Sequence, residues 1–162
     1  MKKVAFFVLV AFVFALPAGA CSSAVISGRA TPDGRPLLWK HRDTRDLEND
    51  VRFFTGEEYT FLGVVNTKDA AGKQVWMGSN ASGFSIMNTV ARNFDRSEIY
   101  KGPMDREGFM MKDALSCCAT VDDFEAMLQR TQGNRGASAN FGVIDAQGGA
   151  AYFETSPDHY EK

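Results

Sequence analysis

Cys21 is the residue in this chain best placed to do chemistry, because it follows a segment organised like a secretory signal peptide. Lys2-Lys3 form a basic start, an apolar run extends from Val4 to Leu16, and the segment closes on Ala18-Gly19-Ala20. This order of basic, apolar and small residues is typical of a leader that is removed at export. Cleavage after Ala20 would leave Cys21 with a thiol and a free α-amino group on one residue.

An N-terminal cysteine brings its own base. The thiol can attack an acyl carbon, and an α-amino group, with an ordinary pKa of about 7.7 to 8.0, can accept the thiol proton directly or through water. The site then needs a group that orients the thiol and a donor that stabilises the oxyanion. A Cys–His dyad is the less favoured arrangement, because the chain holds only His41 and His159.

The orienting group is expected from a β-hairpin that begins at the cysteine. Two β-prone runs, Ser22 to Ala30 and Pro36 to Asp43, are separated by Thr31-Pro32-Asp33-Gly34-Arg35. Proline, aspartate and glycine in this order are typical of a turn, so the sequence predicts two paired antiparallel strands.

The register of this hairpin decides which carboxylate reaches the cysteine. If the turn centre lies between residues 33 and 34, Asp43 pairs with Ala24 and Asp46 pairs with Cys21. A bulge or a longer loop would shift this pairing by a few residues. Both aspartates are therefore candidates to orient the new N-terminus.

Asn88 is the candidate oxyanion donor. In the run Phe84 to Val90, residues alternate as in a half-buried strand, and Asn88 falls on the same face as Phe84 and Ile86. A buried carboxamide must be hydrogen-bonded, and its NH₂ group can donate to an oxyanion. A core asparagine with purely structural partners is equally consistent with this pattern.

The remaining pattern predicts strands, then two helices, then strands. Thr120 followed by Asp123 resembles a helix-start signal. The order favours one α+β layered domain over residues 21–162, after a signal peptide at residues 1–20. Further strands are expected at residues 51–54, 59–65, 74–78, 140–145 and 150–155, and the two helices between residues 105 and 132.

Composition excludes several classes of protein. The net charge is −2 and no basic stripe is present, so no nucleic-acid partner is expected. The apolar run in the leader is too short to span a bilayer, so no stable membrane span is expected. Cys117 and Cys118 are adjacent and are interpreted as buried small hydrophobic residues rather than as part of a disulfide framework. No convincing metal-ligand cluster is seen, and the sequence leaves a homo-oligomer open.

Three blocks of the chain resemble one enzyme family. Cys21 to Gly34 with Trp39 to Asp43, Gly78 to Thr89, and Asn140 to Gly148 followed by Tyr152-Phe153-Glu154 appear in the order in which they occur in the acyl-coenzyme A:6-aminopenicillanic acid acyltransferase family. Choloylglycine hydrolases and penicillin V acylases are its wider relatives. The resemblance covers most of the chain after the leader.

The resemblance implies the four-layer αββα sandwich of N-terminal nucleophile (Ntn) hydrolases and an enzyme without a cofactor. The leader at residues 1–20 predicts export to the periplasm or the extracellular space. Such an enzyme cleaves or transfers an acyl group at a linear amide of a small molecule through a thioester. By this likeness Cys21 is the nucleophile, Asp43 positions it, and Asn88 lies near the oxyanion. The acyl substrate and the choice between water and an amine as acceptor stay open.

The chain also departs from the family. Lys40 stands where the bile-salt relatives carry an arginine three residues before the aspartate, and Arg42 directly precedes Asp43. Lys40 and Arg42 are candidates to favour the thiolate by proximity or to bind substrate, as is Asn80, which also fits turn chemistry. Family members continue well beyond the third block, so the chain is expected to represent the N-terminal half of a longer enzyme.

The competing hypothesis is an exported lipoprotein, in which Cys21 is acylated and cannot be catalytic. Such a protein would be lipid-anchored, or a non-catalytic binding module. A lipobox usually has leucine three residues before the cysteine, where this chain has Ala18. The sequence therefore favours the enzyme over the lipoprotein.

Overall fold

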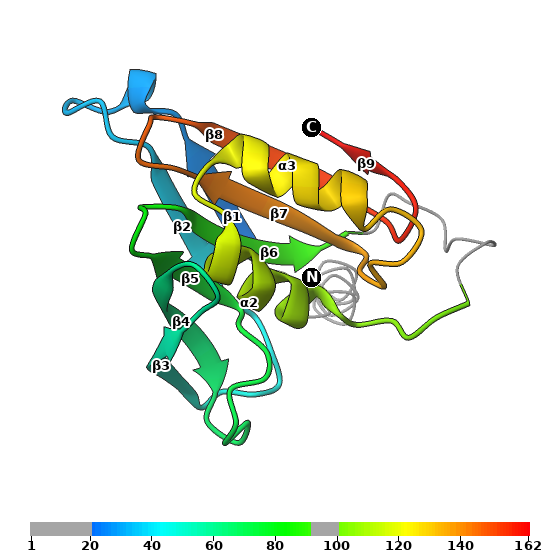
Figure 1. Ribbon diagram of the computed structural model, residues 1–162. Coiled ribbons are helices and arrows are strands. Elements are labelled where there is room, and N and C mark those ends of the chain that lie inside the picture. The colour runs from blue at the N-terminus through cyan, green and yellow to red at the C-terminus, as the bar shows by residue number, and fades with distance from the viewer. Residues whose placement is uncertain (1–20, 92–100) are drawn as a thin grey trace, which may run out of the picture.

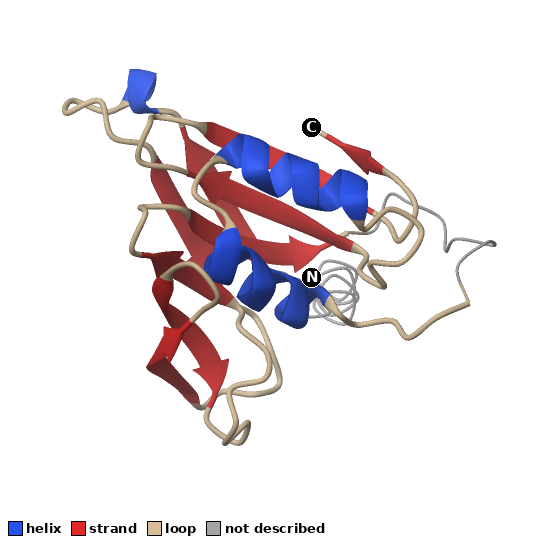
Figure 2. Ribbon diagram, viewed as in Figure 1, coloured by secondary structure: helices blue, strands red, loops and turns tan. Residues whose placement is uncertain are grey.

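The computed structural model describes residues 21–91 and 101–162, and the statements below refer to these residues. The predicted signal peptide at residues 1–20 lies outside them. Figure 1 shows one large twisted sheet with two helices packed on it and a separate hairpin at the start of the described chain. The described residues form both helices and strands, with strands in the majority (Figure 2). This mixture confirms the predicted α+β class.

The large sheet is antiparallel between all neighbours, and its spatial order follows the sequence. Exposed residues alternate with half-buried ones along β3 (Asn49–Thr55), which turns one face of this strand inward, whereas β6 (Ser85–Val90) is buried on both faces from Ile86 to Thr89. The seven strands are β3 (Asn49–Thr55), β4 (Thr60–Asn66), β5 (Met77–Asn80), β6 (Ser85–Val90), β7 (Ala139–Ile144), β8 (Ala150–Thr155) and β9 (Tyr160–Glu161).

Helices α2 (Glu107–Cys117) and α3 (Val121–Arg130) cover one face of this sheet. The predicted start of the second helix is confirmed: the Thr120 side chain accepts from the Asp123 N–H, and the Asp123 carboxylate accepts from the Thr120 N–H. Such a capping box satisfies backbone donors that the helix itself leaves unpaired. The core between helices and sheet contains large, fully buried side chains, among them Phe84, Ile86, Met111, Leu115, Phe124, Leu128, Phe141 and Phe153.

The hairpin of β1 (Ser22–Ile26) and β2 (Leu37–His41) packs on the opposite face of the sheet. Gly142 marks the close approach, because a Cβ there would lie 2.4 Å from Met87 Cε and 2.8 Å from Val25 Cγ2. Adjacent strand residues point to opposite faces, so this contact lies on the side away from the helices. The described residues therefore form three layers: helices, sheet and hairpin.

The expected register of this hairpin was wrong. The structure pairs Ala24 with Trp39 rather than with Asp43, and Ile26 with Leu37 at the loop end. The first strand ends at Ile26 because Gly28–Ala30 form a 3₁₀ turn, closed by hydrogen bonds to the carbonyls of residues 27 and 28. The loop is longer than a simple Pro-Asp-Gly turn, which shifts all the pairs.

Two further differences lie at strand ends. The expected strand from residue 74 begins only at Met77, because the Val75 N–H donates to the Gly108 carbonyl of α2 and leaves the sheet ladder. The short edge strand β9 was not predicted, since two residues carry too little pattern to read. Neither difference changes the order of the layers.

Neither helix in the described part of the chain has the length and apolar character needed to cross a membrane.

Candidate active site

The thiol of Cys21 is held by the main chain of Asp43. Its Sγ donates to the Asp43 carbonyl at 3.5 Å and accepts from the Asp43 N–H at 3.4 Å. The chain leaving β2 therefore lies beside the residue that precedes β1. This contact joins the two residues that the sequence assigned as nucleophile and positioning residue, although it uses Asp43 backbone atoms rather than its carboxylate.

Asp46, the other candidate, binds residues near the end of β4 through its carboxylate. Its carboxylate accepts from Asn66 Nδ2 at 2.9 Å and forms an ion pair with Lys68. Both partners belong to the segment around the end of β4. Of the two aspartates, Asp43 is the one that contacts Cys21.

Lys40 lies on the inward side of the hairpin. In β2 the half-buried residues alternate with exposed ones, and the inward Lys40 pairs with Ser23 while the exposed His41 pairs with Ser22. By the same alternation Cys21, next to the exposed Ser22, shares the inward side with Lys40. The Nζ of Lys40 donates to Asn88 Oδ1 at 2.8 Å and to the Trp76 carbonyl at 2.9 Å.

The surroundings of Lys40 are only partly hydrated. Burial lowers the pKa of Lys40 to about 8, with a smaller contribution in the same direction from Arg42, and the charges of Cys21 and Glu107 oppose that shift. Lys40 is therefore a half-buried cation near the Cys21 thiol. A lysine in this setting changes charge close to neutral pH.

Asn88 is buried, with 7% of its surface exposed, and lies on β6. Its Oδ1 faces the Lys40 ammonium, which has donors and no acceptor. The carboxamide oxygen must therefore face Lys40, and the NH₂ group points away from it. The site thus contains a buried amide whose donor end is not used by the lysine.

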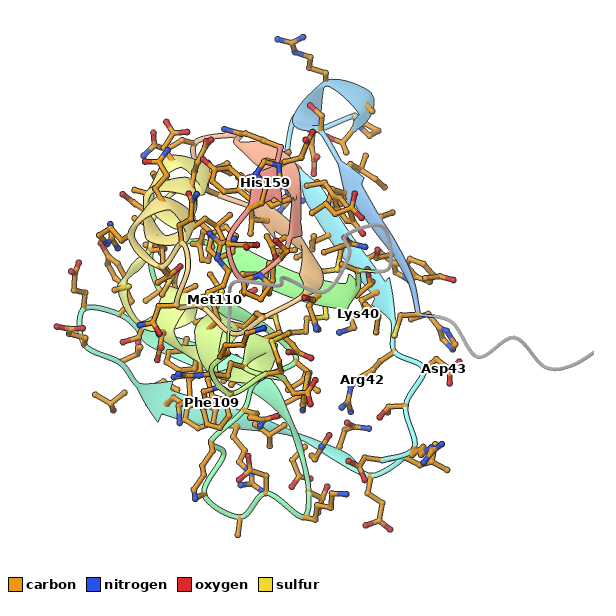
Figure 3. The ribbon with its side chains drawn as sticks, turned by 90° about the vertical axis from the view of Figure 1, so that its right-hand side faces the viewer. Lys40, Arg42, Asp43, Phe109, Met110 and His159 are labelled. Atoms are coloured by element: carbon orange, nitrogen blue, oxygen red, sulfur yellow. The ribbon has the colours of Figure 1, made fainter. Side chains whose placement is uncertain are left out.

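Arg42 contacts the ring of Trp76, whereas Lys40 binds its carbonyl oxygen. Its guanidinium lies 5.1 Å from the centre of the Trp76 ring, donates to Asn66 Oδ1 at 2.8 Å and contacts Asn49 Oδ1. Burial lowers the pKa of Arg42, and the charges of Asp46 and Cys21 oppose the shift. These contacts anchor the end of the hairpin to β3 and β4. Figure 3 shows Lys40, Arg42 and Asp43 along the same end of β2.

Two residues at this site were missed from the sequence. Trp76 supplies a carbonyl to Lys40 and a ring to Arg42. Glu107, in the first turn of α2, has a pKa raised by burial and by Asp105, whereas Lys40 opposes the rise. The sequence favoured a core role for Trp76 and gave no role to Glu107, because both residues come from segments far from the hairpin in sequence.

Asn80 belongs to a different part of the molecule. Its Nδ2 donates to the carbonyls of Leu115 at 3.0 Å and Cys118 at 2.7 Å. Its Oδ1 accepts from the Ser82 N–H, the Ser82 hydroxyl and the Phe84 N–H. The structure thus ties Asn80 to the β5–β6 turn and to the end of α2, and shows no contact between it and Cys21.

The histidines occupy different positions. His41 is exposed on the outer side of β2. His159 lies in the turn before β9, with Nε2 at 3.4 Å from Glu161 Oε1, and Figure 3 shows it well apart from Asp43. The position of His159 gives no support to a dyad between it and Cys21.

Cys117 and Cys118 lie at the end of α2, and burial raises the pKa of both thiols. Cys118 is buried, as expected, and Cys117 is half-buried. All three cysteines are free. No group of three or more His, Cys, Asp or Glu side chains within residues 21–91 and 101–162 is arranged to hold a metal ion.

No protein-family model matches the chain, and no curated protein matches it.

Proposed function

We propose that this chain is an exported cysteine Ntn enzyme that cleaves or transfers an acyl group at a linear amide through a thioester on Cys21. The observation that carries the proposal is the position of the Cys21 thiol, held by the main chain of Asp43 near the half-buried Lys40 and its partner, the buried Asn88. Thiol, cation and amide come from three segments. An N-terminal thiol nucleophile needs a base, which its own α-amine supplies, and a donor for the oxyanion.

In the proposed reaction, loss of residues 1–20 frees the α-amine of Cys21. The amine takes the thiol proton, and the thiolate attacks the amide carbonyl carbon to form a tetrahedral oxyanion. The C–N bond then breaks, and the leaving amine takes the proton from the α-ammonium. The acyl group is left on Sγ as a thioester, with no change in oxidation state.

The second half restores the thiol. Water, or an acceptor amine, loses a proton to the α-amine and attacks the thioester carbonyl. The C–S bond breaks, Sγ regains the proton, and an acid or a new amide leaves. An oxyanion forms on the same carbonyl oxygen in both halves, so a donor such as the Asn88 NH₂ group would serve twice.

The layers support the same proposal. A hairpin that starts at the nucleophile and packs on an antiparallel sheet, itself covered by helices on its other face, is compatible with part of an αββα sandwich. The resemblance of the three sequence blocks adds Asp43 as the positioning residue. We propose small-molecule linear amides as substrates and the periplasm or extracellular space as the location.

The test is a burst experiment on protein expressed with its leader in a secreting host. Acyl p-nitrophenyl esters and the matching p-nitroanilides are the probes, and released chromophore is followed at early times. We expect a burst approaching one equivalent per chain with the esters and Cys21-dependent turnover of at least one anilide. Cys21→Ser should remove both, whereas Cys117→Ser, the matched control, should keep both. An unchanged burst in Cys21→Ser would exclude Cys21 as the nucleophile.

A further inference from the structure

We infer that Lys40 is a positioning residue that fixes the Asn88 carboxamide with its NH₂ group available to the oxyanion. The inference rests on the proposed function and gives Lys40 a role distinct from that of a general positive charge. In this role Lys40, on the hairpin, orients the side chain of Asn88, on the large sheet. The contact that carries it is the hydrogen bond from Lys40 Nζ to Asn88 Oδ1.

The position of the ammonium is set by the main chain. Lys40 Nζ donates to the Trp76 carbonyl, and the Trp76 N–H donates in turn to the Val64 carbonyl of β4. The ammonium is thus tied to the large sheet through an atom that cannot change rotamer. Nζ is held at one place against Asn88, in a half-buried environment where water competes weakly.

Because the Lys40 ammonium can only donate hydrogen bonds, it favours one of the two orientations of the Asn88 carboxamide. A carboxamide turned by 180° would present its NH₂ group to an ammonium, so that donor would face donor and the hydrogen bond would be lost. Asn88 is buried, so the cost of that arrangement would not be relieved by bulk water. Without Lys40, both orientations of the amide become accessible, and only one of them can donate to an oxyanion.

A competing explanation is that Lys40 acts through its charge on the Cys21 thiolate. The charged groups that face Lys40 are Cys21, Arg42 and Glu107, so an electrostatic contribution exists. Two reactions of the same thiol separate the explanations. Acylation by a p-nitrophenyl ester builds an oxyanion, whereas alkylation by iodoacetamide displaces iodide from a tetrahedral carbon and builds none. A charge effect alters both rates, and an effect through Asn88 alters acylation alone.

The experiment measures both rate constants at Cys21 in the protein secreted with its leader. We expect Lys40→Met to slow acylation about 10- to 100-fold, less than the roughly 100- to 1,000-fold cost of removing an oxyanion donor outright because the Asn88 amide is still present, and to change alkylation far less. Lys40→Arg, which keeps the donors and the charge, should restore most of the acylation rate. The double variant Lys40→Met with Asn88→Ala should be no slower than Asn88→Ala alone, because the lysine acts through the amide.

Lys112→Met is the matched control. Like Lys40, Lys112 donates to a main-chain carbonyl, that of Gly72, and its ammonium lies over the Phe54 ring. It lies on α2, outside the proposed machinery, and its loss should leave both rates unchanged. Lys40→Gln is the second variant if the methionine weakens the fold; its neutral amide can donate or accept, so it should also slow acylation selectively.

Each outcome separates the inference from the proposed function. Equal losses in acylation and alkylation, or additive effects of the Lys40 and Asn88 changes, would overturn the positioning role while leaving Cys21 as nucleophile. Normal acylation in Lys40→Met would do the same. Wild-type protein that is never acylated at Cys21 would overturn the proposed function, and the role of Lys40 with it.

Discussion

Lys40 and Asn88 are joined by a 2.8 Å hydrogen bond although 48 residues separate them in the chain. One lies on the N-terminal hairpin and the other on β6 of the large sheet. The contact therefore couples the packing of two layers to the geometry around Cys21. Changes that move the hairpin or remove Asn88 should alter the chemistry of the thiol, and changes that touch neither should act on stability alone.

Asn80→Ala is predicted to destabilise the fold. Its carboxamide joins the β5–β6 turn to the Leu115 and Cys118 carbonyls at the end of α2, and its removal leaves these buried groups unpaired. We expect the free energy of unfolding to fall by about 2 to 4 kcal/mol in urea denaturation. Ser82→Ala, which removes only one hydrogen bond to Asn80, should cost less than about 1.5 kcal/mol. Equal losses for the two variants would argue against this role.

The free energy of unfolding should depend on pH through Lys40 between about pH 8 and pH 10.5. Burial lowers its pKa to about 8 from the ordinary 10.5. Between these values the unfolded chain binds more protons than the folded one, so the contribution of Lys40 to the unfolding free energy rises with pH. The penalty for burying the charge is complete below about pH 8 and is relieved toward pH 10.5, by at most about 3 kcal/mol.

The measurement compares wild type with Lys40→Met in urea at pH 7 and at pH 10, under reducing conditions. The stability of the variant relative to wild type should decrease as pH rises. Cys117 and Cys118, whose thiol pKa values are raised by burial, act in the opposite direction in both proteins and cancel in the comparison. A difference that is constant between the two pH values would show that Lys40 does not titrate in this window.

Asp43→Asn should separate the two contributions of this residue. The contacts to Cys21 Sγ come from the Asp43 main chain, which the substitution keeps. Alkylation by iodoacetamide should therefore stay close to wild type. If the carboxylate orients the freed α-amine, as the family resemblance implies, acylation by the ester should fall about 10- to 100-fold, up to the lower end of the roughly 100- to 10,000-fold range for proton-transfer catalysis, because the amine itself is kept. An unchanged acylation rate would show that the Asp43 carboxylate does not orient the α-amine.

Gly142→Ala should loosen the hairpin on the sheet. A Cβ at this position would lie 2.4 Å from Met87 Cε, so the flexible end of that side chain and the hairpin must give way. We expect a loss of about 1 to 3 kcal/mol in unfolding free energy, together with slower acylation. Adding Met87→Ala makes room for the new methyl group and should recover part of the loss relative to the sum of the single changes. Strictly additive effects would contradict this packing.

The elements of this fold that local pattern defines were predictable. Alternation located β6, and the Thr120 and Asp123 pair located the start of α3, because strand faces and helix caps are set by neighbours within a few residues. The hairpin strands were found, but their register was not. The 3₁₀ turn at Gly28–Ala30 lengthens the loop, and a turn of that kind has no strong sequence signal.

The site was predictable only in part. Cys21 and Asp43 were assigned together and do make contact. The partnership of Lys40 with Asn88 depends on how the hairpin lies on the sheet, and the approach of Glu107 depends on where α2 begins. Such contacts are set by the packing of layers rather than by spacing along the chain. For Asn80, the sequence predicted its position in a turn but not its hydrogen bonds to the end of α2.

The most direct test of the central claim is peptide mass mapping of the secreted protein before and after brief exposure to an acyl p-nitrophenyl ester, quenched in acid. Acid keeps the α-amine protonated and prevents the acyl group from moving from Sγ to nitrogen. The account predicts a mature chain that begins with unmodified Cys21 and gains one acyl group on that peptide. A chain isolated with a fatty acyl group on Cys21, or an ester adduct found only elsewhere, would contradict it.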